Sequence, residues 1–346
     1  MIAASSKSGQ PETTAQDLPR HGSWQQLLAD AIRDPAELCR LLDLEESVVA
    51  AAIAATPGFA LRVPRSFVAK MRRGDPNDPL LLQVLPRRHE LDVVDGFSLD
   101  PVGDLEARTS QGVLHKYLGR ALLIATGACA VHCRYCFRRH FPYSDESALS
   151  QGWSSTLSYV RGDSSIDEII LSGGDPLSLS DRRLHQLTDA LESVAHVRRL
   201  RIHTRYPLVL PERIDASFLH WLSNVRLQKV IVVHANHANE MDDVSRRACR
   251  ELAAAGATVL NQSVLLAGVN DDAETLANLS EALFAAGVLP YYLHILDRVA
   301  GAAHFEVPTE RALRLHSELT ARLPGYLVPR LVREISGAPS KTAVTA

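Results

Sequence analysis

Three cysteines lie close together near the middle of the chain, separated by three and then two residues. They are Cys129, Cys133 and Cys136, and they directly follow the apolar run 121–125. Thiolates at this spacing, on a loop that leaves a strand, can converge on one soft metal centre. Four thiolates complete an ordinary iron–sulfur cluster, whereas three leave one iron open to a small molecule. The spacing therefore predicts an iron–sulfur cluster with an open position.

This cysteine spacing resembles that of the radical S-adenosylmethionine (SAM) enzymes. In those enzymes the open iron holds the amino and carboxylate groups of SAM. The remaining cysteines, Cys39 and Cys249, lie alone within helical patterns. An odd count of five favours a metal site plus two buried thiols in a reducing compartment over a disulfide framework.

The overall composition is that of an ordinary globular protein. The 346 residues, 46% hydrophobic and 22% charged, allow one large α/β domain with an appendage, or two domains. A net charge of -3 gives no reason to propose nucleic acid or an acidic membrane as a partner. The chain has no apolar run near the ~20 residues that span a bilayer, and its start lacks the layout of a secretory signal. We expect a cytoplasmic protein.

From Arg120 onward, apolar β-branched runs alternate with amphipathic helical segments. The predicted strands are 121–125, 166–171, 199–203, 229–234, 258–265 and 289–296. The predicted helices lie near 146–160, 180–195, 212–223, 239–255, 271–286 and 309–322. Nearly continuous apolar strands flanked by helices indicate a covered parallel sheet. We therefore predict an α/β fold, a partial (βα)6-type TIM barrel that would form the radical SAM core.

The pattern divides the chain into regions of different character. Short helical patterns at 24–32, 35–42 and 45–55 predict a helical appendage before the barrel. The predicted regions are a disordered lead-in at 1–20, a mostly helical region at 21–119, the barrel at 120–325, and a strand with a short tail at 326–346.

Polar groups follow several predicted strands, at the barrel end where chemistry collects. The second strand leads into Ser172-Gly173-Gly174-Asp175. Paired glycines let the backbone approach a ligand closely, and a carboxylate such as that of Asp175 can accept hydrogen bonds from an ammonium or a ribose hydroxyl. We interpret this loop as a SAM-binding edge.

Two histidines three residues apart, His234 and His237, follow the fourth predicted strand. Such a pair could bind zinc, although no third ligand has convincing spacing, so we favour polar residues lining a pocket. Gln262 interrupts the fifth apolar strand together with its polar neighbours. Polar groups in a buried strand need partners, which favours a bound polar ligand.

Lys341 is one of few lysines and stands in a Gly-Ala-Pro-Ser-Lys-Thr turn near the C-terminus. The simplest interpretation is a solvated charge in a frayed tail. The alternative is an amine nucleophile that holds an aldehyde cofactor as a Schiff base.

The order of motifs resembles the lysine 2,3-aminomutases, radical SAM enzymes that also use pyridoxal phosphate (PLP). The resemblance covers roughly residues 80–343. Besides the cysteine loop through Arg139, it rests on Leu171-Ser-Gly-Gly-Asp175, Arg205-Tyr-Pro-Leu-Val-Leu-Pro211, Asn261-Gln-Ser-Val-Leu-Leu266, Gly268-Val-Asn-Asp271, Pro290-Tyr-Tyr292, His304-Phe305 and Gly325-Tyr326.

The resemblance implies cofactor sites, residue by residue. The cysteine triplet would hold a [4Fe–4S] cluster that binds SAM, and Lys341 would bind PLP covalently in the short C-terminal tail. Residues expected to contact the PLP phosphate are Lys116, Tyr117, Arg120 and Gln262; residues expected to contact the cofactors elsewhere are Ser172, Gly173, Gly174, Asp175 and His234. Lys116 stands where the family has an arginine, so it would act as a point charge.

The resemblance also implies a substrate site. Arg138 would bind the substrate carboxylate, a bidentate geometry that arginine suits. Asp297 and Glu334 would recognise a distal ammonium group, with Glu334 standing where the family has an aspartate.

The activity that follows is conversion of L-lysine to (R)-β-lysine, with electrons from an external donor. The ending resembles the short bacterial members of the family, whose product is attached to elongation factor P by a lysyl-tRNA-synthetase-like ligase. The full-length aminomutases continue well past the PLP lysine, so homo-oligomerisation stays open. Two alternatives remain: a free-standing aminomutase that makes β-lysine or another β-amino acid as a metabolite, and a scaffold whose cysteines bind a structural metal.

Overall fold

A computed structural model gives the structure of residues 22–143 and 153–345. The predicted lead-in at 1–20 and the first part of the predicted helix at 146–160 lie outside the described residues.

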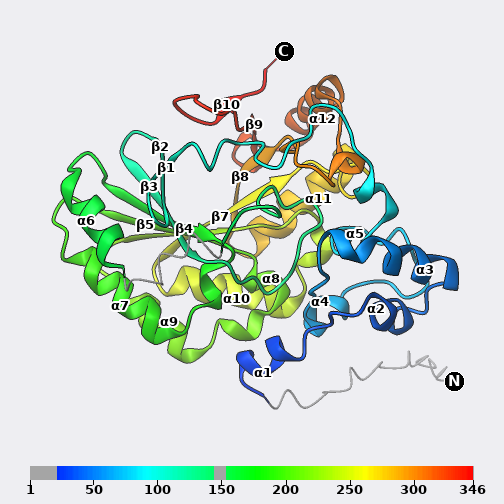
Figure 1. Cartoon of the computed structure of the whole chain (residues 1–346), viewed down its shortest axis with the longest axis horizontal. Coiled ribbons are helices and arrows are strands. Elements are labelled where there is room, and N and C mark those ends of the chain that lie inside the picture. The colour runs from blue at the N-terminus through cyan, green and yellow to red at the C-terminus, as the bar shows by residue number, and fades with distance from the viewer. Residues whose placement is uncertain (1–21, 144–152, 346) are drawn as a thin grey trace, which may run out of the picture.

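The described strands form one curved sheet in which neighbours in sequence are neighbours in space (Figure 1). Strands β3 to β9 run parallel, while β1 and β2 at one end and β10 at the other pair antiparallel. The strands are β1 (Arg108–Ser110), β2 (Val113–Tyr117), β3 (Arg120–Thr126), β4 (Glu168–Gly173), β5 (Arg199–Thr204), β6 (Gln228–Val233), β7 (Ala257–Val264), β8 (Leu289–His294), β9 (Arg330–Arg333) and β10 (Thr342–Ala343). The predicted partial barrel is confirmed, because the parallel strands among the described residues form a sheet with two ends. To the six predicted barrel strands it adds β9, from the predicted C-terminal region, which pairs parallel with β8.

Helices between the strands cover the outside of the sheet (Figure 1). They begin where the sequence supplies N-caps, as at Asp242, whose carboxylate accepts the N–H of Ser245. The α-helices are α1 (Trp24–Ala29), α2 (Pro35–Leu41), α3 (Glu46–Ala55), α4 (Arg65–Val68), α5 (Pro79–Leu82), α6 (Ser154–Gly162), α7 (Asp181–Glu192), α8 (Tyr206–Val209), α9 (Ala216–Asn224), α10 (Asp243–Ala254), α11 (Ala273–Ala285) and α12 (Thr309–Arg322). Within the described residues, none of these helices has the length and apolar character to cross a membrane.

The region at 21–119 differs in part from the prediction of a mostly helical segment. Its last residues form β1 and β2, which extend the sheet beside β3. Val113 and Leu114 are buried there because they pair with Leu123 and Leu122 of β3 in a hairpin that turns at Leu118-Gly119. The short apolar pieces before Arg120 were not interpreted as strands, so this hairpin was not predicted.

Polar contacts fasten the N-terminal region to the barrel. The Lys70 ammonium donates to the Leu208 and Glu240 carbonyl oxygens at 2.7 and 2.9 Å. Further along, the Glu90 carboxylate accepts hydrogen bonds from Arg134 and Arg139, two arginines of the cysteine loop. Because the side chains of Arg134 and Arg139 are 0% and 2% exposed, Glu90 supplies the charge that lets this loop be buried.

Replacing Glu90 with glutamine should therefore lower the free energy of unfolding by about 3–5 kcal/mol, the usual cost of leaving one side of a buried ion pair without its partner. Glu306→Gln is the matched control, because Glu306 pairs with Arg298 near the surface, with side chains that are 32% and 59% exposed. That substitution should cost less than about 1 kcal/mol. Denaturant unfolding measures both, and equal losses would contradict the structural role of Glu90.

The loop after β4 lies directly against the cysteine loop. The Gly174 N–H donates to the Thr126 carbonyl at 2.6 Å, and the Asp175 N–H donates to that of Ala128 at 2.8 Å. A Cβ at Gly174 would lie only 2.4 Å from the Ala128 oxygen. Only glycine therefore allows this approach.

Gly174→Ala should reduce stability by about 1–3 kcal/mol, because the added methyl group meets backbone that cannot move aside. Gly162→Ala is the control, since no heavy atom lies within 4 Å of a Cβ built there. Thermal unfolding of the two variants measures the difference. Similar midpoints would show that the two loops can separate without cost.

Candidate functional site

A cavity of about 530 Å³ lies inside the curved sheet. Alternate strand residues face it: Arg201 and His203 on β5, Gln262 on β7, and Tyr292 and His294 on β8. This spacing follows from the two-residue period of a strand, which sends successive side chains to opposite faces. The loops and the C-terminal tail supply the other reactive and charged side chains of the cavity.

The cysteine loop borders this cavity through Cys133 and Cys136, while Cys129 is half-buried. Burial, together with the nearby Cys133 thiol, raises the pKa of Cys136 to about 11. The Arg205 guanidinium donates to the Cys133 sulfur at 2.9 Å. Three soft donors beside a fixed cation fit an anionic iron–sulfur cluster. In the described part of the chain, no three His, Cys, Asp or Glu side chains lie close enough together to hold a single metal ion, so the cluster site stays a prediction from the cysteine spacing.

Of the loop at 172–175, only Ser172 lines the cavity. The Asp175 carboxylate is turned toward the chain itself, accepting the Arg205 N–H at 2.7 Å and the Thr204 hydroxyl at 3.0 Å. Burial raises its pKa to about 6. In this conformation the loop joins the ends of β4 and β5, and its role as a SAM-binding edge stays a prediction.

The four residues predicted to contact a phosphate all line the cavity. Two have buried atoms without a hydrogen-bond partner among the described residues, Nε of Arg120 and the Gln262 amide oxygen. The other two are engaged: Tyr117 donates to Glu334 at 2.6 Å, and Lys116 pairs with Asp104 at 2.6 Å. Orphaned polar groups beside an arginine fit a bound anion, so Arg120 and Gln262 are the better phosphate candidates in this conformation.

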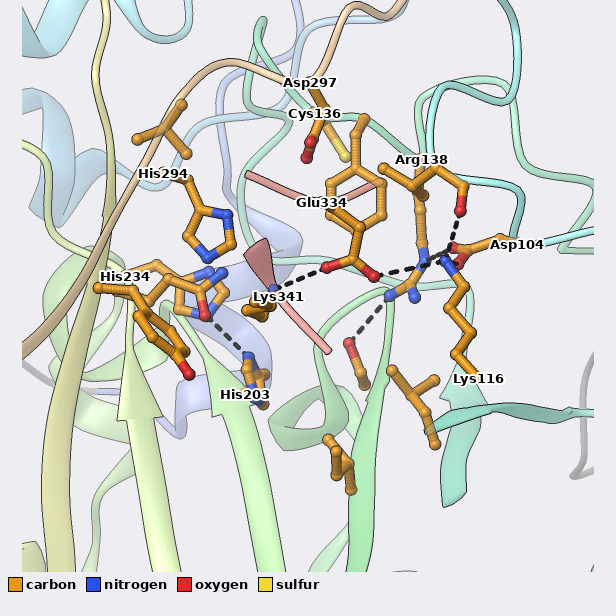
Figure 2. Close-up of a pocket in the computed structure, with 18 of the residues that line it drawn as sticks. Asp104, Lys116, Cys136, Arg138, His203, His234, His294, Asp297, Glu334 and Lys341 are labelled. Atoms are coloured by element: carbon orange, nitrogen blue, oxygen red, sulfur yellow. Dashed lines mark hydrogen bonds and ion pairs between the residues drawn. The ribbon is translucent and has the colours of Figure 1, made fainter. Parts of the chain in front are cut away.

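Lys341 points into the cavity rather than into solvent, and its side chain is 21% exposed (Figure 2). The antiparallel pairing of β10 with β9 turns the tail back over the sheet. The Lys341 ammonium donates to Glu334 at 2.9 Å. The simplest interpretation of this lysine, a frayed tail, is therefore wrong.

Three histidines stand beside Lys341, of which His294 is buried and His203 and His234 are half-buried (Figure 2). His203 Nδ1 and His234 Nε2 are 3.1 Å apart, and Nε2 of His294 has no partner among the described residues. Burial lowers all three pKa values, that of His234 to about 3, with Lys341 adding to the effect. The three rings are therefore neutral. His237 does not line this cavity; its Nδ1 accepts the Asn239 N–H.

The residues predicted to bind substrate lie around the same cavity. Arg138 donates through Nε to Asp104 at 2.6 Å and through Nη1 to Ser172 at 3.0 Å. Asp297 makes no side-chain hydrogen bond within the described residues, and burial raises its pKa to about 7 despite the nearby Lys341 ammonium. A bound cation would stabilise the ionised form of this carboxyl group, which burial otherwise disfavours.

Sequence reasoning missed several residues that line the cavity. Arg201 on β5 is bound by Glu168, and Arg330 on β9 lies over the Tyr292 ring. The two-residue alternation of β5 could have identified Arg201. No pattern in the sequence identifies Asp104 as a cavity residue, because it lies in a loop without hydrophobic periodicity.

The comparisons with known proteins point to one family. The chain is 50% identical to the L-lysine 2,3-aminomutase of Escherichia coli (strain K12) over 325 residues, which cover 94% of this chain and 95% of that protein. It is 48% identical to the L-lysine 2,3-aminomutase of Haemophilus influenzae, over 92% of this chain and 95% of that protein. No protein-family model matches.

Among solved structures, a radical SAM methyltransferase from Sphaerobacter thermophilus is 19% identical with a TM-score of 0.45, covering 65% of this chain and 71% of that one. A likeness at that level carries no argument about activity. Identity near one half over almost the full length of both chains is decisive by itself: the chain belongs to the L-lysine 2,3-aminomutase family and is an isomerase.

Proposed function

We propose that this protein converts L-lysine to (R)-β-lysine by 2,3-amino migration. The observation that carries the proposal is the charge layout of one cavity. Arg138 stands at one side as a ligand for a carboxylate, and Glu334 and Asp297 stand near Lys341 as ligands for an ammonium group (Figure 2). A lysine has both groups, and the names of the relatives agree with this substrate.

The cofactors of the proposal are a [4Fe–4S] cluster, SAM and PLP. Cys129, Cys133 and Cys136 would hold the cluster, and Lys341 would hold PLP with Arg120 and Gln262 at its phosphate. Together these groups supply a carbon-centred radical and an electron sink for the migrating nitrogen. An external donor supplies the electron. A cytoplasmic location agrees with the free thiols of Cys39 and Cys249.

The chain's own residues prepare the site. To bond a carbonyl carbon, Lys341 Nζ must lose a proton, and the Glu334 carboxylate at 2.9 Å is its nearest acceptor. After Glu334 releases this proton to solvent, its carboxylate no longer faces a Lys341 ammonium and can bind the ammonium group of the substrate. The neutral histidines add no positive charge that would repel it. Burial of the site keeps water away from reactive intermediates.

Two acids at the distal end argue against neutral or acidic substrates. Such a substrate would leave Asp297 and Glu334 buried without a cation, at a cost of several kcal/mol. We extend the proposal to the fate of the product, which would be attached to elongation factor P by a lysyl ligase. This step rests on the resemblance to the short members of the family.

A substrate panel tests the proposed reaction. The anaerobic protein, supplied with iron, sulfide, SAM, PLP and a reductant, should convert L-lysine to one enantiomer of β-lysine and leave glutamate and alanine almost unchanged. Chiral chromatography of the products measures this. Faster turnover of glutamate or alanine would overturn the proposal. Addition of the product to elongation factor P with its ligase tests the second part separately.

The raised pKa of Asp297 predicts a pH dependence. Its carboxyl group is neutral below about pH 7 and ionised above, and only the ionised form attracts an ammonium group. The value of kcat/KM for L-lysine should therefore fall roughly tenfold for each pH unit below about 7 and level off above it.

L-Norleucine, which lacks the distal ammonium, is the control ligand. Its inhibition constant should show no such step, because an uncharged side chain gains nothing from an ionised Asp297. The same pH step for lysine and norleucine would assign the titration to another group.

A further inference from the structure

Asp104 lies between two cations at the edge of the cavity (Figure 2). One carboxylate oxygen accepts Nε of Arg138 and the other accepts the Lys116 ammonium, both at 2.6 Å. The residue is 2% exposed. Burial raises the pKa of Asp104, but Arg138 and Lys116 outweigh this effect and lower it, so the carboxylate is ionised.

The loop that carries Asp104 is built to hold it in place. The Asp100 carboxylate accepts the N–H groups of Asp104 and Leu105, each at 2.9 Å. Gly103, which lies between Asp100 and Asp104 in the chain, has a φ of +66°, a conformation that glycine adopts without strain. A Cβ at Gly103 would lie 2.3 Å from the Ser336 hydroxyl, so the loop packs closely against the C-terminal tail.

The position of Asp104 determines how Arg138 faces the cavity. A guanidinium group is planar and carries five N–H donors in a rigid fork. Asp104 takes the Nε donor and Ser172 takes one from Nη1, which leaves Nη2 without a hydrogen-bond partner among the described residues. Because the group is rigid, fixing two donors fixes the direction of the others.

We infer that Asp104 is a positioning residue for substrate recognition, which holds the free edge of Arg138 toward the carboxylate of the substrate. The inference rests on the proposed function, since it takes Arg138 as the ligand of that carboxylate. Asp104 itself does not touch the substrate. Its effect should therefore appear only for ligands that have a carboxylate.

The test needs a background in which Lys116 cannot interfere. Lys116 Nζ lies 3.6 Å from Glu334, so a lysine released from Asp104 could pair with Glu334 and disturb the ammonium end. Lys116→Met is therefore compared with the double variant Asp104→Asn, Lys116→Met. Both PLP-loaded proteins are titrated by calorimetry with L-norleucine, which lacks the distal ammonium, and with 1,5-diaminopentane, which lacks the carboxylate.

The double variant should bind L-norleucine roughly tenfold to a hundredfold more weakly than Lys116→Met, as expected for loss of a charged hydrogen-bond partner. The two proteins should bind 1,5-diaminopentane equally. Restoring a carboxylate with Asp104→Glu in the same background should recover part of the norleucine affinity. Equal weakening for both ligands would show a merely structural role, and no change for either ligand would also overturn the inference.

Asp181→Asn, made in the same Lys116→Met background, is the matched control. Asp181 also pairs with a buried arginine, Arg213, at 2.7 Å, but neither residue lines the cavity. This variant should leave the affinity for both ligands unchanged. Failure of the unmodified protein to convert L-lysine would refute the proposed function alone, because the norleucine titration still reports whether Asp104 positions Arg138.

Discussion

A buried arginine must be paired with an acidic side chain, and such pairs attach the N-terminal region to the barrel. Arg134 and Arg139 of the cysteine loop are neutralised by Glu90 from the N-terminal region. Arg205, which follows β5, is neutralised by Glu240, which follows β6, at 2.7 Å. An unpaired charge at any of these positions would cost several kcal/mol. The loop that carries the cysteines is therefore held on one side by its ion pairs with Glu90 and on the other by Arg205, which donates to Cys133.

The same rule organises the cavity, where charges alternate in sign. From one side to the other they are those of Arg138, Asp104, Lys116, Glu334 and Lys341. Each carboxylate lies between two cations. This arrangement keeps a highly charged site near neutrality. Among the described residues it leaves one edge of Arg138 and the side-chain carboxyl group of Asp297 without a hydrogen-bond partner. Those are the groups that a zwitterionic ligand with a second ammonium would satisfy.

The element pattern and the reactive residues could be predicted from the sequence. The six central strands and most of the helices follow from hydrophobic period and caps, and Cys129, Cys133 and Cys136 follow from spacing. The strands β1 and β2 were not predicted, because they are short, are joined to each other and to β3 by tight turns, and carry little hydrophobic period of their own. Asp104 was not predicted either, because its role depends on its contact with Arg138, 34 residues away in the chain.

By itself the sequence determined which reactive groups the protein has: three cysteines at cluster spacing, an arginine next to them, and a lone lysine near the end. Only the tertiary structure decided what each of them faces. It turned Lys341 into the cavity by pairing β10 with β9, and it brought Tyr117 to Glu334 across 217 residues of chain. The physical reason is that spacing along a chain sets local geometry, whereas the partner of a buried charge is chosen by the packing of distant elements.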